Sequence, residues 1–223
     1  MPNIKPIVSR LGFEHRRGGH CMVSNDEQFI YIPIAKNAST FTEFLLETVC
    51  DWHYDDYVSN KNLLNKHIIV ILRDPLKRWM AGVVEHFSER NNPISGVDLN
   101  NNALLHYVFN QCALDVHTEL QLNFLAGVDT ENCTFIKLDN TYSRVLEDFI
   151  EYRLGKKISI WGKDVATKYN KTVDKPFKQI LLSYVKKYYD KNKEAQLGVL
   201  NYLRPDYDLI NSLEFYNKIK SGI

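Results

Sequence analysis

The apolar run His67-Ile68-Ile69-Val70-Ile71-Leu72 constrains the fold of this chain more than any other segment. Its residues are β-branched or leucine at nearly every position instead of alternating with polar ones, which is typical of a parallel strand covered on both faces. Asp74 then suits a helix N-cap and Pro75 a first helical residue, so we expect a helix that continues to about Arg90. The segment predicts a strand, a short loop and a helix.

A second unit of the same kind precedes it. The apolar run from Phe29 to Ile34 predicts a buried strand, and a helical pattern follows over residues 39–47, with Ser39 or Thr40 suited to its cap. Alternating strands and helices predict an α/β fold with a central parallel β-sheet flanked by helices. In such folds ligands bind at the carboxyl ends of the strands, where the loops after both runs would lie.

The C-terminal half is expected to be rich in helices. One further strand is predicted from Thr134 to Leu138. Helical patterns lie over residues 103–112, 118–125, 142–153 and 176–189, with a final short helix near 205–213. The polar residues 91–102 predict a surface loop, and residues 162–175 form a basic stretch that begins with glycine.

Length and charge limit the classes of function. The 223 residues suit a single domain, for which we expect an N-terminal extension over residues 1–25 and a core over residues 26–215. A formal net charge of +1 gives no overall attraction to nucleic acid or to an anionic membrane, so any anion site must be local. No segment approaches the roughly 20 apolar residues of a membrane span, and the first residues lack the apolar run of a signal peptide. We therefore expect a soluble, cytoplasmic protein with neither a nucleic-acid nor a membrane partner, of open oligomeric state.

The four cysteines predict neither a metal site nor a disulfide framework. Cys21, Cys50, Cys112 and Cys133 form no C-x-x-C pair, and no histidine lies at zinc-ligand spacing from them. Buried free thiols are expected, with one disulfide as an open alternative.

The loop between the first strand and its helix, Ala35-Lys36-Asn37-Ala38-Ser39-Thr40, combines the features of an anion site. N–H groups and the dipole at a helix start stabilise an anion, and small residues let the backbone approach it closely. Lys36 adds a full charge, and the hydroxyls of Ser39 and Thr40 add donors. The G-x-x-x-x-G-K-[ST] spacing of a Walker A loop is absent.

The second loop begins with Arg73, whose forked guanidinium at a strand end can contact a terminal phosphate. Asp74 and Pro75 fix the turn, and Arg78 lies one turn into the helix. Either loop alone could be an ordinary capped helix start with an exposed cation. The pair, each between a strand and a helix, favours phosphate binding.

Together the two loops resemble the phosphate motifs of the sulfotransferase superfamily, which uses 3′-phosphoadenosine 5′-phosphosulfate (PAPS). Residues 33–40 resemble the P-x-x-K-N-A-S/G-T form of the 5′-phosphosulfate loop in the carbohydrate sulfotransferases. Residues 70–81 resemble the 3′-phosphate motif, a strand followed by R-D-P-x-x-R-x-x-S. The resemblance implies a P-loop-like domain that transfers a sulfuryl group from PAPS to a hydroxyl of a carbohydrate or related small-molecule or glycan acceptor, releasing 3′-phosphoadenosine 5′-phosphate.

Weaker similarity extends over the rest of the chain. Residues 115–125 look like the D-x-H-x-x-x-Q-x-x-x-L segment of the carbohydrate type, and similar stretches lie at 135–139, 168–172 and 202–210. One position departs from the family, because the serine of the 3′-phosphate motif is Ala81 here. The lost hydroxyl bond would cost about 1.5–3 kcal/mol, which weakens the site without abolishing it unless Lys77, Ser88 or a residue of the C-terminal basic loop compensates.

The resemblance also implies roles for particular residues. Lys36 would stabilise the bridging oxygen of the donor, and His117 is the favoured general base for the acceptor proton, with His53 second. For His117 a structural role stays open, as a polar residue that starts a helix and pairs with Asp115 or Gln121. His86, His67 and Glu43 rank below them as candidates for the base. The residues expected to bind the cofactor are Ala35, Lys36, Asn37, Ala38, Ser39, Thr40, Arg73, Ala81, Lys168 and Lys171, and no metal is implied.

Two other classes of function stay open. One is a nucleotide- or glycan-binding protein that keeps the sulfotransferase fold without turnover, which the alanine at position 81 would favour. The other is a P-loop kinase or NTPase, against which the missing Walker A loop and Walker B aspartate count. The intact Lys36 and Arg73 favour the enzyme over the binding protein.

Overall fold

The computed structural model describes residues 21–55, 66–89, 102–156 and 176–216. The surface loop expected at 91–102 lies outside these ranges except for its last residue. The basic stretch 162–175, which includes Lys168 and Lys171, also lies outside the described residues.

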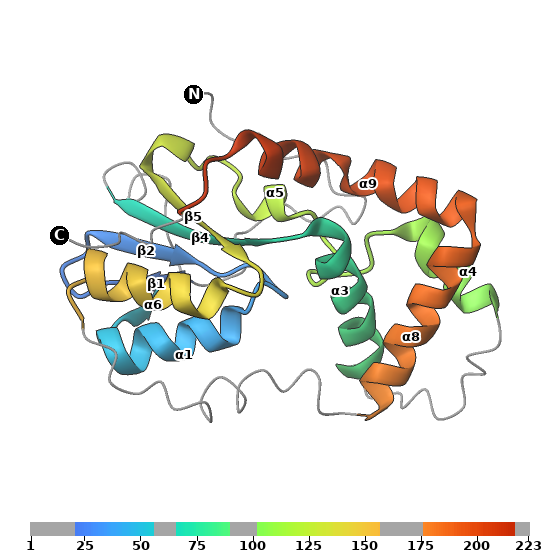
Figure 1. Ribbon diagram of the computed structural model, residues 1–223, viewed down its shortest axis with the longest axis horizontal. Helices are drawn as coiled ribbons and strands as arrows, with labels where there is room; N and C mark the ends of the chain where they lie inside the picture. Colours follow the sequence, from blue (N-terminus) through green and yellow to red (C-terminus); the bar gives the residue numbers. More distant parts are fainter. Residues whose placement is uncertain (1–20, 56–65, 90–101, 157–175, 217–223) are drawn as a thin grey trace.

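An α/β fold is built around an open five-stranded sheet with the strand order β3-β1-β2-β4-β5 (Figure 1). Strands β2 (Phe29–Ile32), β4 (His67–Arg73) and β5 (Cys133–Leu138) are parallel and occupy the positions predicted from their apolar runs. Their carboxyl ends point together toward the middle of the molecule (Figure 1). The expected strand, loop and helix units after β2 and β4 are therefore confirmed.

The sheet is mixed instead of purely parallel, because two short strands were missed by the sequence patterns. β1 (Cys21–Val23) pairs antiparallel with both β2 and β3 (His53–Asp55). A tight turn joins β1 to β2, in which the N–H of Glu27 donates to the carbonyl of Ser24 at 2.8 Å. Runs of three residues are too short to show an alternating pattern. β1 also brings part of the segment expected to be an N-terminal extension into the central sheet.

Helices cover both faces of the sheet (Figure 1). On one face α1 (Ser39–Cys50) and α6 (Tyr142–Arg153) pack against Tyr31, Ile69 and Ile71. On the other face lie the short α5 (Gln121–Phe124) and the end of α9 (Lys193–Ser212). They pack against the strand side chains that point to this face, including Val70 and Leu72. Side chains of successive strand residues point to opposite faces, so the uninterrupted apolar run of β4 supplies both cores.

A third core joins the helices beyond the sheet. α3 (Pro75–Glu89), α4 (Asn102–Gln111), α8 (Pro176–Lys191) and α9 surround Trp79, whose indole N–H donates to the carbonyl of Cys112 at 2.7 Å. This confirms the expected helix-rich C-terminal half. Since α3 follows β4 directly, it connects the carboxyl edge of the sheet with the helical part (Figure 1).

Two helix predictions were wrong in extent. α9 begins at Lys193, not near Pro205, because the side chain of Asn192 caps it by accepting from the N–H of Ala195 at 3.1 Å. Pro205 lies inside this helix. The helix expected over 118–125 shrinks to α5, because the Thr118 hydroxyl accepts from the N–H of Leu114 at 2.7 Å and holds the preceding residues in a turn.

Two further findings concern the cysteines and the lengths of the helices. All four cysteines are free thiols, and three of them are buried, so the open alternative of a disulfide is not realised. Among the described residues no helix combines the length and the apolar character that crossing a membrane requires.

Candidate functional site

The two loops that follow β2 and β4 are held together by hydrogen bonds at the carboxyl edge of the sheet. The side-chain amide of Asn37, which is fully buried, donates to the carbonyl of Ile71 at 2.7 Å. A guanidinium N–H of Arg73 donates to the carbonyl of Lys36 at 3.2 Å. The loop residues predicted from two distant parts of the sequence therefore lie together.

The start of α1 has no side-chain cap, although the sequence suggested Ser39 or Thr40 for that position. Lys36 and Ala38 have φ angles of 68° and 57°, and Ala38 is the N-cap with no side-chain capping bond. Ser39 and Thr40, expected as caps, are instead the first two helical residues. Neither a side-chain cap nor an acidic residue occupies the first turn. The N–H groups and the positive end of the helix dipole are therefore available to an anion.

Arg78 of the second motif is a structural residue. Its side chain is 1% exposed and lies over the ring of Phe124. The guanidinium donates to the carbonyl of Ala35 at 2.9 Å and also to that of Glu119, so it ties α3 to the first loop and to the segment before α5. A charge held in this way is unavailable to a ligand, which leaves Arg73 as the candidate cation at the start of the second motif.

The side chain of Gln121 forms hydrogen bonds with both loops. Its carbonyl oxygen accepts from the side chain of Asn37 at 2.7 Å and from the N–H of Arg73 at 3.0 Å. Its amide nitrogen donates to the carbonyl of Arg73 at 2.9 Å. The buried carboxylate of Asp206 in turn accepts from the N–H groups of Gln121 and Leu122, each at 2.9 Å. The resemblance over 115–125 included this glutamine, but its contact to both loops could not be read from the sequence.

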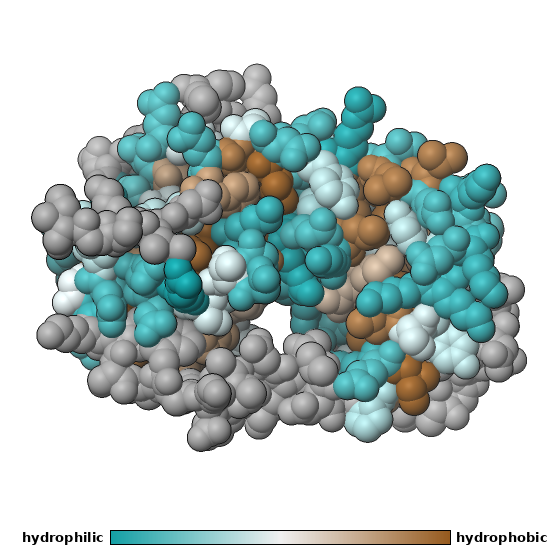
Figure 2. Space-filling model, in the orientation of Figure 1, coloured by the Kyte–Doolittle hydropathy of each residue, from teal (hydrophilic) through white to brown (hydrophobic). Residues whose placement is uncertain are grey.

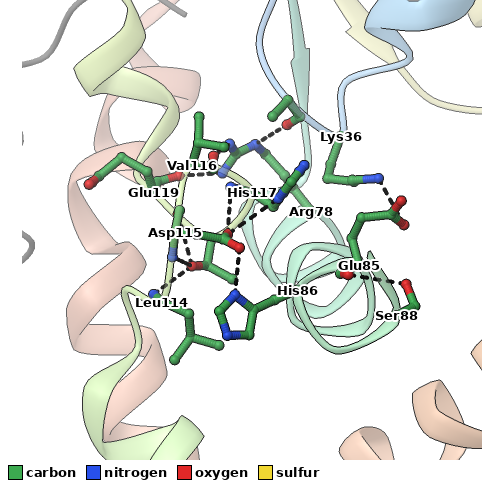
Figure 3. Close-up of polar contacts among 12 residues, drawn as sticks. Lys36, Arg78, Glu85, His86, Ser88, Leu114, Asp115, Val116, His117 and Glu119 are labelled. Atoms are coloured by element: carbon green, nitrogen blue, oxygen red, sulfur yellow. Dashed lines mark hydrogen bonds and ion pairs between the residues drawn. The ribbon is translucent and has the colours of Figure 1, made fainter. Parts of the chain in front are cut away.

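Lys36 is ion-paired with a residue that the sequence did not single out. Its ammonium lies 3.0 Å from the carboxylate of Glu85 on α3, as Figure 3 shows. Lys178 of α8 lies 2.7 Å from the same carboxylate. Glu85 lies one helical turn after the motif position Ala81 on α3, so its nearness to the site could have been predicted. Lys178 lies far away in the sequence, and no pattern indicates its contact with Glu85.

The favoured base His117 shares an aspartate with His86 (Figure 3). Nδ1 of His86 lies 2.5 Å from one oxygen of Asp115, and Nδ1 of His117 lies 3.4 Å from the other. Burial alone would raise the pKa of Asp115, but hydrogen bonds from His117 and His86 outweigh it and lower the pKa to about 2. His86, ranked low from the sequence, is therefore part of the same cluster as His117.

Replacing Asp115 with asparagine is expected to lower the free energy of unfolding by about 1–2 kcal/mol at pH 6, a value reduced for the partial exposure of the carboxylate. A pKa depressed by folding contributes stability above the unfolded-state pKa, and this contribution is lost as the pH falls toward 2. Roughly half of the difference between wild type and variant should thus be gone by about pH 3. Urea unfolding at both pH values measures it, with Asp190→Asn on the exposed side of α8 as control; a pH-independent difference would contradict the assignment.

The structure does not bring His53 or His67 to the loops. His53 is exposed on β3 and pairs with Val23, which itself pairs with Ile30 near the beginning of β2, so it lies at the opposite edge of the sheet. His67 begins β4 and contacts the hydroxyl of Thr134 at 2.6 Å, also away from the loops.

The described part of the site lies beside a hollow in the surface. Figure 2 shows the surface hollowed between the sheet with α1 and α6 on one side and α3 with α8 on the other. The beginning of α1 faces this hollow (Figure 1). Within the described ranges no group of three or more His, Cys, Asp or Glu side chains could hold a metal ion.

The arrangement can therefore neutralise a polyanion and accept a proton. Lys36, Arg73 and the start of α1 supply positive potential, and the imidazoles of His86 on α3 and His117 before α5 both lie beside Asp115. Comparison of the chain with protein-family models, with curated proteins and with solved structures gave no match.

Proposed function

We propose that this chain is a PAPS-dependent sulfotransferase of the P-loop-like type, acting on a hydroxyl of a carbohydrate or related acceptor. The observation that carries the proposal is the contact between the two loops, in which Arg73 donates to the carbonyl of Lys36 at 3.2 Å. A donor with a phosphosulfate at one end and a phosphate at the other requires two such cationic loops side by side. Their likeness to the family motifs supports the same function.

The residues present fit such a donor. Lys36 and the uncapped start of α1, with Ser39 and Thr40, would hold the phosphosulfate, and Arg73 would hold the 3′-phosphate. Bound PAPS would supply an activated sulfuryl group whose leaving group is a stable bisphosphate. Ala81 contributes no donor, and the described part of the site contains a carboxylate, Glu85, that reduces the local positive charge.

The chain's own groups would then act by position and charge. The ammonium of Lys36 would stabilise the negative charge that develops on the oxygen leaving the sulfuryl group. His117 would take the acceptor's proton at Nε2, because its Nδ1 lies 3.4 Å from Asp115, whose negative charge would stabilise an imidazolium. His86 shares that carboxylate and would fix its position.

One observation favours the second candidate, a nucleotide- or glycan-binding protein without turnover. Lys36 is held by Glu85 in an ion pair, and an alanine stands at position 81 where the family has a serine. A binding protein could keep Arg73 and the start of α1 without a lysine that is available for chemistry. Binding of the bisphosphate with no sulfuryl transfer to any acceptor would favour this alternative.

Calorimetric titration with 3′-phosphoadenosine 5′-phosphate and with ATP, each with and without magnesium, tests the proposal. We expect selective, magnesium-independent binding of the bisphosphate. Arg73→Ala should weaken it at least about 10-fold because a charge-assisted, forked contact is lost. The control Lys186→Ala, an exposed lysine on α8, should leave affinity within about twofold. Absence of binding, or a preference for magnesium-ATP, would contradict the proposed function.

A further inference from the structure

Lys178, near the beginning of α8, places a second ammonium group next to that of Lys36. Its ammonium lies 2.7 Å from Oε2 of Glu85, and the ammonium of Lys36 lies 3.0 Å from the same oxygen atom. Because both nitrogens contact one oxygen, the two cations are close neighbours. One comes from the loop after β2 and the other from the helical part of the molecule.

The cluster holds excess positive charge where little solvent reaches it. The side chains of Lys36, Lys178 and Glu85 are 16%, 11% and 7% exposed. The guanidinium of Arg73 contacts the backbone carbonyl of Lys36, in the loop that carries the first of these lysines. Two ammonium groups thus share one carboxylate oxygen, and the side chains of Lys36, Lys178 and Glu85 together carry a formal charge of +1. Poorly solvated like charges repel one another, so an anion that joins them is stabilised there.

We propose that Lys178 and Lys36 together bind one tetrahedral oxyanion, and that this oxyanion is the sulfuryl end of the donor. The assignment of the oxyanion rests on the proposed function. An ammonium group has three N–H donors, so each lysine can keep its bond to Glu85 and donate another to the same oxyanion. The loop before α1 and the helix α8, which carry the two lysines, lie on the two sides of the hollow (Figures 1 and 2).

Inorganic sulfate is the first probe, because it requires no nucleotide. Sodium sulfate is titrated at constant ionic strength into wild type, Lys178→Met, Lys178→Arg and the control Lys186→Met, and binding is followed by NMR chemical shifts. Lys178→Met should weaken sulfate binding about 10-fold, since one charge-assisted bond is lost. Lys178→Arg should keep most of the affinity, and Lys186→Met should change it by no more than about twofold. Sulfate affinity that is unchanged in Lys178→Met, or equally weakened in Lys186→Met, would overturn the proposal.

A second comparison identifies the source of the oxyanion. Lys178→Met should weaken binding of PAPS about 10-fold while changing affinity for 3′-phosphoadenosine 5′-phosphate, which lacks the sulfuryl group, by no more than about twofold. If variant and wild type bind PAPS equally while the variant binds sulfate more weakly, the oxyanion belongs to the acceptor. That result would overturn its assignment to the sulfuryl end of the donor. Failure of wild type to bind the bisphosphate would contradict the proposed function alone, because the sulfate titration is independent of the nucleotide. In Lys178→Met, Glu85 retains its ion pair with Lys36, so the variant is expected to fold.

Discussion

Replacing Lys36 with methionine is expected to lower kcat for sulfuryl transfer about 10²- to 10³-fold, the usual effect of removing one preorganised donor at a developing negative charge. The side chain of Lys36 is 16% exposed and precedes the uncapped start of α1, so water replaces its ammonium poorly. Release of 3′-phosphoadenosine 5′-phosphate from PAPS, measured with a panel of sugars as acceptors, gives the rate.

The same variant separates catalysis from folding. Glu85 keeps its contact to Lys178 at 2.7 Å when Lys36 is removed, so the carboxylate is not left without a partner. The melting temperature should therefore change little, and the exposed Lys186→Met provides the matched loss of one lysine. A kcat within a few-fold of wild type would show that Lys36 is not the group that stabilises the leaving oxygen.

Gly82→Ala is expected to destabilise the protein by about 3 kcal/mol, near the upper end of the range for overpacked sites. A Cβ at this position of α3 would lie 2.1 Å from the carbonyl oxygen of His117, and Thr118 lies close as well. Both obstacles belong to the turn that carries Asp115, so the helix or the turn must move. For a chain of this length the melting temperature should fall by roughly 6–12 °C.

Gly198→Ala on α9 is the matched control. The nearest atom to its added Cβ is the carbonyl oxygen of Phe109 at 3.8 Å, an ordinary contact. Here the higher helix propensity of alanine should dominate and raise stability by about 0.5–1 kcal/mol. Opposite signs at the two glycines are thus expected, and a stabilising Gly82→Ala would show that the close approach of α3 to His117 is absent in solution.

The sequence predicted the elements that carry a strong local signal. β4 has seven residues and an unbroken apolar run, and α6 was placed with its observed bounds. β1 and β3, with three residues each, leave too short a pattern, and their position is decided by pairing with β2 and with each other. Pro205 misled the prediction of α9, because a proline that suits a helix start can also lie inside a helix when a cap further upstream sets its beginning.

The site was predictable where it depends on the backbone at strand ends and unpredictable where it depends on distant side chains. Lys36 follows β2 and Arg73 ends the adjacent parallel strand β4, so topology alone brings them together. The pairing of Glu85 with Lys178 joins residues 93 positions apart through the packing of α3 against α8. His53 was wrongly predicted to lie near the acceptor, because the three-residue edge strand β3 that carries it leaves no recognisable sequence pattern.

The amide of Gln121 touches the side chain of Asn37 and both backbone groups of Arg73. The separation between the two cationic loops is therefore set when the chain folds, before any ligand arrives, and the entropy of arranging them is not lost again on binding. A ligand with two anionic ends can contact both loops only if the distance between its ends matches this fixed separation. Nucleotides whose phosphates are spaced differently could engage one loop at a time, so selectivity among them would follow from molecular length as well as from charge.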